Sequence, residues 1–213
     1  MKNYLKKITT LLAFGLVTIS CTKADTPQVS TAGNSTPICT TTNSLFQQLY
    51  NPLNTSTFPE NLSGYNNAVI HEYTFKVTNP ATICSIGYQS QTALATQNYV
   101  IEIFDTVSSS IVSTITTTFS STATSYVALN TPLVLVAGKS YKIKRYGPAT
   151  VANPNGAGRM VSNNVTGSGN VSFPKTSGNL TITSSDFYTK NSSIIVSAND
   201  NNNSLPFIDL IFQ

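Results

Sequence analysis

The feature that most limits what this chain can fold into is a two-residue alternation of polar and apolar side chains that starts at residue 71. In the stretch HEYTFKV, Tyr73, Phe75 and Val77 are apolar and alternate with polar residues. Because successive side chains of a β-strand point to opposite faces, this alternation predicts a strand with one buried face. Related patterns predict strands at residues 83–89, 99–105, 111–119, 126–129, 133–136, 140–146, 159–161, 171–173, 180–183 and 206–212.

Turn signals separate these strands. Asn79 and Pro80 end the first strand, and the AGK turn at residues 137–139 joins the two strands of the best-defined hairpin. Pro132 indicates a bend or an edge strand, since proline cannot donate a hydrogen bond to a neighbouring strand. Roughly nine or ten short strands with such turns between them predict an all-β fold, a single antiparallel β-sandwich of the jelly-roll or immunoglobulin-like type.

The N-terminus has the layout of a secretory signal. Lys2, Lys6 and Lys7 precede an apolar run over residues 8–19, and Cys21 follows that run. About a dozen apolar residues are too few for a membrane-spanning helix, which needs roughly 20. The sequence therefore predicts export from the cytoplasm.

The stretch LVTISCTKAD around Cys21 resembles the cleavage region of bacterial lipoproteins. This resemblance implies that the signal is cut before Cys21, whose thiol and new amino group then carry fatty acyl chains such as palmitate. Lys23 and Asp25 partly match the residues that mark some lipoproteins for the cell surface. The implied location is the outer membrane of the cell envelope, on its surface or its periplasmic face. An ordinary secretory cut after Ser20, which would give a secreted protein, is the alternative.

Three parts follow from this interpretation: a signal peptide at residues 1–20, the lipidated cysteine and a polar tether at residues 21–42, and a β-sandwich domain at residues 43–213. The tether is rich in Thr, Ser, Pro, Gly and Asn and has almost nothing to bury, which is typical of a flexible linker. At the start of the domain, Ser44 and Gln47 have the spacing of a helix capping box. A short helix is expected there, with a strand as a close alternative.

Charge and composition exclude some classes of partner. Three of the twelve basic residues lie in the signal, which leaves nine bases against eight acids in the rest of the chain. A near-neutral chain offers no basic stripe for phosphate backbones, so nucleic acid is not an expected partner. The expected partners are the membrane, through the lipid anchor, and a glycan or a surface protein.

The three cysteines agree with export. If Cys21 is lipidated, Cys39 and Cys84 remain as a pair in an oxidising compartment. Joining them would stabilise the domain by about 4 kcal/mol through loop-closure entropy. The alternation of the predicted strand places Cys84, Ile86 and Tyr88 on one face. Two buried, unpaired thiols are the alternative.

No catalytic constellation can be assembled from the sequence. His71 is the only histidine and is expected at the surface or at a strand edge. The G-x-S-x-G nucleophile motif is missing. Glu72, Glu102 and Asp105 are the acids that a glycosidase could use, but Glu102 stands between two isoleucines, which is typical of a solvated sheet face. No cofactor and no metal are expected, and the NDNNNS stretch at residues 199–204 is more typical of a loop than of a calcium site.

From about Glu72 to Gln213 the chain also resembles a family of β-sandwich domains of unknown function in bacterial secreted and surface proteins. The stretches that carry the resemblance are EYTFKV, ICSIGY, YVIEIFD, NTPLVLVAGKSYKIKRYG and PFIDLIF. Such domains often stand beside immunoglobulin-like or carbohydrate-active modules. The resemblance implies a β-sandwich and a location outside the cytoplasm.

The longest predicted loop, residues 147–158, is the expected ligand site, because loops at the ends of a sandwich are free to vary and to bind. Tyr146, Arg145 and Arg159 flank it, and a phenol beside a guanidinium suits sugar rings or carboxylates. Strand alternation puts Arg145 and Tyr146 on opposite faces. Tyr146 and Arg159 are therefore the expected ligand-binding residues, and Arg145 is expected to pair with Asp209, an acid within the apolar last strand.

The expected function is that of a non-enzymatic, lipid-anchored protein of the cell envelope that binds a glycan or another surface protein. An accessory subunit in the assembly of a surface complex is the second interpretation. A hydrolase is disfavoured, because the chain lacks the histidines and the nucleophile motifs that such enzymes use.

Overall fold

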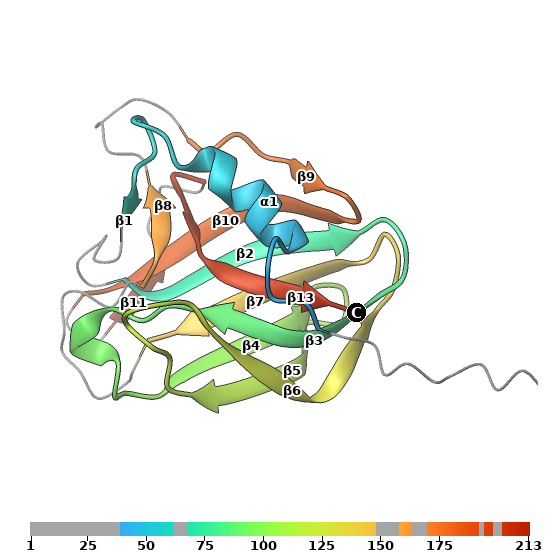
Figure 1. Ribbon diagram of the computed structural model, residues 1–213, viewed down its shortest axis with the longest axis horizontal. Helices are drawn as coiled ribbons and strands as arrows, with labels where there is room; N and C mark the ends of the chain where they lie inside the picture. The colour runs from blue at the N-terminus through green and yellow to red at the C-terminus, as the bar shows by residue number, and fades with distance from the viewer. Residues whose placement is uncertain (1–38, 62–67, 148–157, 163–169, 192–193, 198–201) are drawn as a thin grey trace, which may run out of the picture. The chain divides into compact units, whose positions relative to one another are not determined.

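Two antiparallel sheets, one of seven strands and one of three, form the layers of the fold (Figure 1). The computed structural model describes residues 39–61, 68–147, 158–162, 170–191, 194–197 and 202–213. The path through the large sheet is β11 (Ile194–Ser197), β10 (Leu180–Asn191), β2 (Ala68–Val77), β7 (Ser140–Tyr146), β4 (Tyr99–Asp105) and β5 (Ser110–Thr117), with β9 (Lys175–Ser177) paired to β10.

The small sheet lies against one face of the large sheet (Figure 1). Its order is β13 (Ile208–Phe212), β3 (Ala81–Tyr88) and β6 (Ser125–Leu135). A further set of short strands, β1 (Glu60–Asn61), β8 (Met160–Ser162) and β12 (Ser204–Pro206), pairs at one end of the sandwich, where the 3-10 helix η2 (Thr92–Leu94) also lies. The chain is an antiparallel β-sandwich, as the alternation predicted.

Alternation decides which side chains enter the core. Every second residue of β4 and β7 is buried, so Ile101 and Ile143 point inward, whereas Glu102 and Lys144 stay on the outer face. Burying one large aliphatic side chain contributes about 1.5–3 kcal/mol. The small sheet supplies the opposite wall of the core with Ile83, Ile86, Tyr88, Leu129, Leu135, Ile208 and Leu210.

The strands predicted from clear alternation are confirmed, and the differences have identifiable causes. The segments at residues 126–129 and 133–136 form one strand, β6, whose Pro132 lies on the edge of the small sheet. The prediction of a strand at residues 171–173 was wrong. Val171 is buried there, but its N–H donates to the carbonyl of Asn202 in a loop contact.

The last strands were predicted with the wrong bounds. β10 continues to Asn191 instead of ending at residue 183, because it pairs with nearly the whole length of β2. The final segment, predicted as one strand at residues 206–212, divides at Phe207 into β12 and β13, which belong to different sheets.

Cys39 and Cys84 form a disulfide, as the cysteine count favoured. The bridge ties the first described residue to β3, so the end of the predicted tether is fixed to the domain. Strand pairings skip Cys84 on both sides, since Ile83 and Ser85 have partners in β6 and β13. Against β13, where Ile211 and Phe212 are consecutive, Cys84 is thus the extra residue of a β-bulge, which interrupts the alternation expected between Cys84 and Ile86.

The helix expected near residue 44 is α1 (Leu45–Tyr50), and the 3-10 helix η1 (Asn51–Leu53) continues it. The Ser44 hydroxyl accepts a hydrogen bond from the Gln47 N–H at 3.0 Å, so Ser44 is the N-cap. The Gln47 side chain closes the turn from the other direction, because its oxygen accepts from the Asn43 N–H at 2.8 Å. Packing of Phe46, Leu49 and Tyr50 against the sandwich then fixes the helix.

A buried carboxylate attaches α1 to the small sheet. Asp209 is fully buried on β13 and accepts hydrogen bonds from the Ser44 hydroxyl at 2.6 Å, the Gln47 amide at 2.7 Å and the Tyr126 hydroxyl at 3.0 Å. Burial raises the pKa of Asp209 above its ordinary value, against the effect of these donors. The acid that interrupts the apolar last strand therefore holds the N-terminal cap of α1.

Gly87 makes this arrangement possible, because Asp209, Gly87 and Tyr126 lie in one row across β13, β3 and β6. A Cβ atom at position 87 would lie 2.3 Å from Cε1 of Tyr126, which is closer than atoms can approach. The missing side chain therefore lets the tyrosine ring lie across β3 and reach the carboxylate.

We predict that Gly87→Ala lowers the free energy of unfolding by about 1.5–3 kcal/mol, because the displaced Tyr126 ring loses its hydrogen bond to a buried charge. In a Tyr126→Ala background the same change should cost nothing, since alanine is the better strand residue. Urea unfolding of the four proteins measures the coupling. Equal costs of Gly87→Ala in both backgrounds would contradict the explanation.

Candidate functional site

A fully buried arginine lies at one end of the core. Arg145 of β7 has no exposed surface and lies opposite His71 of β2 in the strand pairing. Its guanidinium carbon is 5.8 Å from the ring centroids of both Tyr88 and Tyr99. A desolvated cation between two aromatic rings gains about 2 kcal/mol or more from cation–π attraction. The predicted pairing with Asp209 is not among the contacts described, since the Asp209 carboxylate receives donors from α1 and β6.

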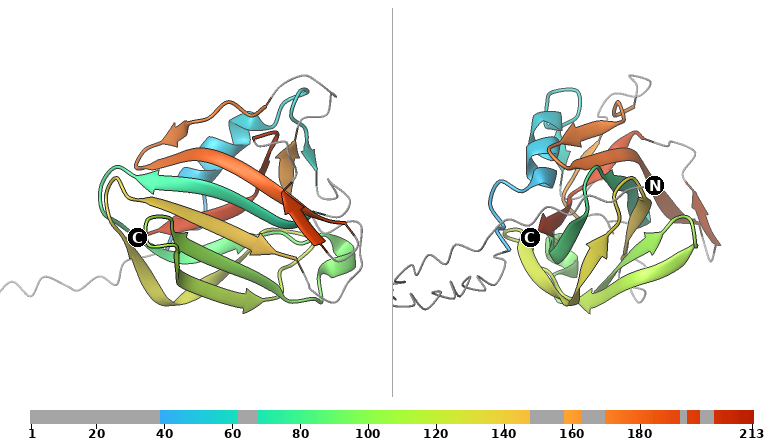
Figure 2. Two further views of the ribbon diagram at one scale, coloured as in Figure 1. Left: turned by 180° about the vertical axis from the view of Figure 1, so that it is seen from behind. Right: turned by 90° about the vertical axis from the view of Figure 1, so that its right-hand side faces the viewer.

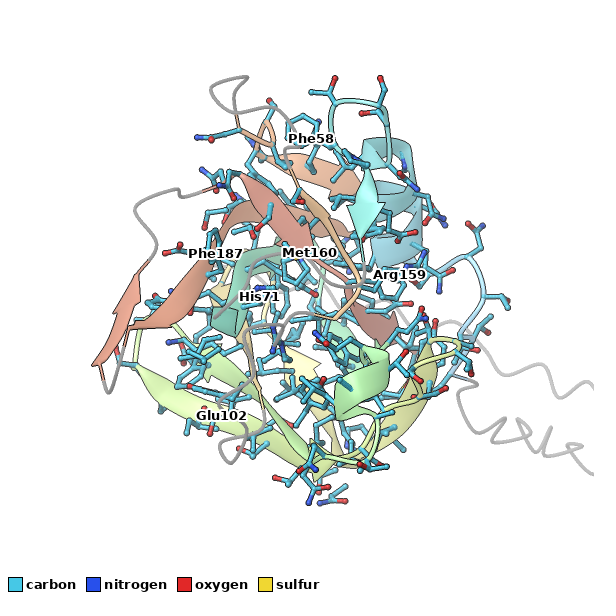
Figure 3. All side chains as sticks on the ribbon, turned by 90° about the vertical axis from the view of Figure 1, so that its left-hand side faces the viewer. Phe58, His71, Glu102, Arg159, Met160 and Phe187 are labelled. Atoms are coloured by element: carbon cyan, nitrogen blue, oxygen red, sulfur yellow. A yellow bond between two sulfur atoms is a disulfide. The ribbon has the colours of Figure 1, made fainter. Side chains whose placement is uncertain are left out.

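His71 belongs to the same buried cluster, and the expectation of a surface or edge position was wrong. Its side chain is 1% exposed, because β2 lies inside the large sheet and His71 shares the inward face with Tyr73. The edge of its ring meets Phe187, with ring centroids 6.1 Å apart (Figure 3). Burial, and then the charge of Arg145, lower the pKa of His71 well below its ordinary value. The imidazole is therefore neutral.

Arg159 lies in a separate cluster on the side of α1. Its guanidinium bonds to Glu60 of β1 and lies 4.0 Å from the ring centroid of Phe207, with Tyr50 of α1 also nearby at 5.6 Å. Figure 3 shows Arg159 and Glu102 on opposite sides of the sandwich end. Tyr146 bonds to Glu102, so the structure does not bring Tyr146 and Arg159 together.

The structure does not describe most of the predicted ligand loop at residues 147–158. Residues 148–157 lie outside the described residues, as do Cys21 and residues 199–201 of the second candidate loop. The described end of that second loop is bound into the fold: Asn202 donates its N–H to the Ser185 carbonyl, and its side-chain oxygen accepts from the Ser185 N–H. In the described parts of the chain, no three His, Cys, Asp or Glu side chains lie together in a way that could hold a metal ion.

The outer face of the large sheet carries a different cluster, which we call the open-face cluster. Figure 2, left, shows this face with no described helix or second sheet over its middle. The cluster consists of side chains that point away from the core on four adjacent strands: Tyr188 of β10, Glu72 of β2, Lys142, Lys144 and Tyr146 of β7, and Glu102 and Phe104 of β4.

Glu72 is the centre of the open-face cluster. One of its oxygens accepts from the Lys142 ammonium at 2.5 Å and from the Tyr188 hydroxyl at 3.3 Å, and the other lies 3.2 Å from Lys144. These neighbours leave Glu72 only 3% exposed, although it is on an outer face. Two cations around one carboxylate hold all three charged groups in fixed positions.

Aromatic rings flank this charged centre. The Lys144 ammonium lies 5.0 Å from the ring centroid of Phe104 and 5.8 Å from that of Tyr188. Burial, followed by the charge of Glu72, raises the pKa of Tyr188 to about 12. Burial and the hydrogen bond to Glu102 likewise raise the pKa of Tyr146. Both phenols are therefore protonated at neutral pH and act as hydrogen-bond donors.

The acids considered for glycoside cleavage do not converge. Glu72 and Glu102 share the open face, where Glu72 is occupied by lysines and Glu102 by Tyr146. Asp105 lies at the far end of β4 and bonds to Lys139, which lowers the pKa of Asp105 to about 2. Within the described residues, each of these acids thus has a partner that holds its carboxylate in place.

Comparison with protein-family models gives no match for this chain, and neither does comparison with curated proteins. No helix among the described residues is long and apolar enough to span a membrane. The interpretation of the open-face cluster therefore rests on its own geometry.

Part of the open-face cluster could have been predicted from the sequence. Alternation in the predicted strands at residues 71–77 and 140–146 already placed Glu72, Lys142 and Lys144 on outward faces. Alternation does not show that these two strands are neighbours, so the cluster was missed. Tyr188 gave no signal, because its part of β10 was not predicted as a strand.

We predict that lowering the pH reduces the free energy of unfolding more for the wild-type protein than for a His71→Gln variant. The unfolded chain binds a proton at His71 near pH 6.5, whereas the folded protein does not, so folding stability falls as the pH decreases below that value. The slope should approach about 1.4 kcal/mol per pH unit. Urea unfolding between about pH 7 and pH 5 measures it. Because both proteins keep Asp209, its titration cancels, and parallel curves would contradict a buried neutral histidine.

Proposed function

We propose that this protein is a lipid-anchored, non-enzymatic binding module of the cell envelope. The apolar run before Cys21 and the lipoprotein-like stretch around it support the anchor. A polar segment then leads to the β-sandwich, whose described part begins at the Cys39–Cys84 bridge. This order of signal, anchor, tether and exported domain is that of a protein held at a membrane surface.

The ligand surface in this proposal is the open face of the large sheet, and the ligand class is a glycan. The observation that carries it is the arrangement of the open-face cluster, in which Tyr146, Tyr188 and Phe104 surround charged groups already held in place by one another. Aromatic rings pack against the apolar faces of sugars, and fixed donors and acceptors meet their hydroxyls. Fixed side chains also reduce the entropy lost on binding.

The first test concerns the anchor. Mass spectrometry of the mature chain from bacterial membranes should show acyl groups on an N-terminal Cys21. A Cys21→Ala chain should be released or left unprocessed, because two or three acyl chains hold a protein firmly to a bilayer and none hold the variant. A mature chain with an unmodified Cys21 would remove the anchor from the proposal.

The second test concerns the ligand surface. A glycan array probed with the chain should give binding that Tyr146→Ala and Tyr188→Ala each weaken at least about tenfold, which corresponds to about 1.4 kcal/mol. The matched control is Tyr126→Ala. Tyr126 is also a half-buried tyrosine bonded to a carboxylate, but it lies on the small sheet. Binding that persists in both open-face variants would contradict the proposed surface.

The variant Arg159→Lys tests whether the ligand binds on the open face or at the loop end, the part of the sandwich beside the predicted ligand loop at residues 147–158. This change keeps the charge but loses the planar contact with Phe207, on the side of the molecule away from Glu102. Binding that depends on Arg159 and not on Tyr188 would place the ligand at the loop end. No glycan binding by a folded, anchored chain would favour the accessory-subunit alternative.

A further inference from the structure

The exposed apolar side chains gather at one end of the sandwich. Five large hydrophobic side chains among the described residues are exposed to solvent: Val107, Ile111, Val112, Val134 and Val136. The two most exposed are Val107, at 79%, and Val134, at 67%. Single exposed valines are ordinary, but a group confined to one region marks an interaction surface.

Backbone contacts place these five residues around one corner. Val107 lies in the turn between β4 and β5, and Val136 lies at the turn between β6 and β7. The two turns meet, because the Thr106 N–H donates to the Ser140 carbonyl at 3.2 Å and Lys139 pairs with Asp105. The other members stand at the start of β5 and the end of β6, beside these turns: Ile111, Val112 and Val134. Figure 1 shows this end of the sandwich on the right.

The described chain begins near this end, where Cys39 is bonded to the middle of β3. Cys39 is bonded to Cys84, which follows Ile83, and Ile83 pairs with Leu133, the neighbour of Val134. Residues 22–38 connect Cys21 to Cys39, and a chain of that length spans at most about 60 Å. The exposed valines are therefore on the side of the domain from which the anchor segment departs.

We propose that this end of the sandwich docks on the lipid bilayer that holds the acyl chains of Cys21. We call its five apolar residues, Val107, Ile111, Val112, Val134 and Val136, the docking corner. The inference rests on the anchor in the proposed function and adds a second contact with the same membrane. The valines enter the boundary between headgroups and acyl chains, as apolar side chains of peripheral proteins do.

The charge near the docking corner suits anionic headgroups. Lys76 is exposed at the end of β2, next to Ser140 in the strand pairing, and Lys139 keeps about a third of its surface exposed. Asp105 is the acid bonded to Lys139. Basic side chains near a membrane add attraction to anionic lipids, and that attraction weakens as salt is raised.

Spin labels at single introduced cysteines test the docking. Cys21 is acylated in the proposal, and Cys39 is bonded to Cys84, so a new cysteine is the only free thiol. Labels are placed at Val107→Cys and Val136→Cys, with Thr96→Cys at the other end of the sandwich as the control. The lipidated chains are reconstituted in vesicles of phosphatidylcholine and phosphatidylglycerol, and Cys21→Ser versions of each serve as references.

The measured quantity is the rate at which each spin label collides with a water-soluble nickel chelate. It should fall at least threefold at positions 107 and 136 on anchoring and stay unchanged at position 96. The variant Val107→Asn with Val136→Asn, read from a label at Ile111→Cys, should lose this protection. The matched control, Ala93→Asn with Ala123→Asn, changes exposed residues at the opposite end and should keep it.

Each outcome decides a different point. Chains that float with the vesicles but stay equally accessible at all positions overturn the docking and leave the anchor intact. Chains that do not float, because Cys21 carries no lipid, overturn both. Labels that are already protected in the unanchored references identify a second copy of the chain as the occupant of the docking corner, which also overturns the bilayer proposal.

Discussion

The rest of this fold depends on how it keeps one positive charge away from water. Arg145 is the largest fully buried side chain in the described part of the domain, and burying a cation costs several kcal/mol unless its surroundings compensate. Tyr88 and Tyr99 supply ring faces from two different sheets, so the charge also joins the two layers. It also affects its neighbour, because burial and then the charge of Arg145 lower the pKa of His71 and keep that imidazole neutral.

Strand β7 shows how one short sequence can serve two surfaces at once. Its inward side chains end in Arg145 and build the core, whereas Lys142, Lys144 and Tyr146 build the open-face cluster. The strand lies between β2 and β4, so each of its outward residues has neighbours on both sides. A shift of the β7 register by one residue would bring Arg145 to the surface and bury lysines. The register of this strand is therefore unusually well defined.

The sequence was most informative where structure is determined locally. Alternation predicted most of the strands, and the cysteine count favoured the Cys39–Cys84 bridge, which is confirmed. Contacts between distant segments could not be predicted from the sequence. Asp209 holds the cap of α1, and Tyr146 and Arg159 lie on different sides of the sandwich.

The failures have a common physical origin. Alternation reports which face of a strand is buried, but it does not report which other strand lies beside it or above it. β10 shows the same limit, because its polar second half is a strand through its pairing with β2 and β11.

The disulfide between Cys39 and Cys84 also determines how the domain carries a mechanical load. A pull along the chain from residues before Cys39 passes through the sulfur atoms directly into β3, the central strand of the small sheet. The segment between the two cysteines, which contains α1 and β2, is closed covalently and bears none of that tension. Tension must then shear β3 against both of its neighbours together, so α1 cannot be peeled from the sandwich as a first step.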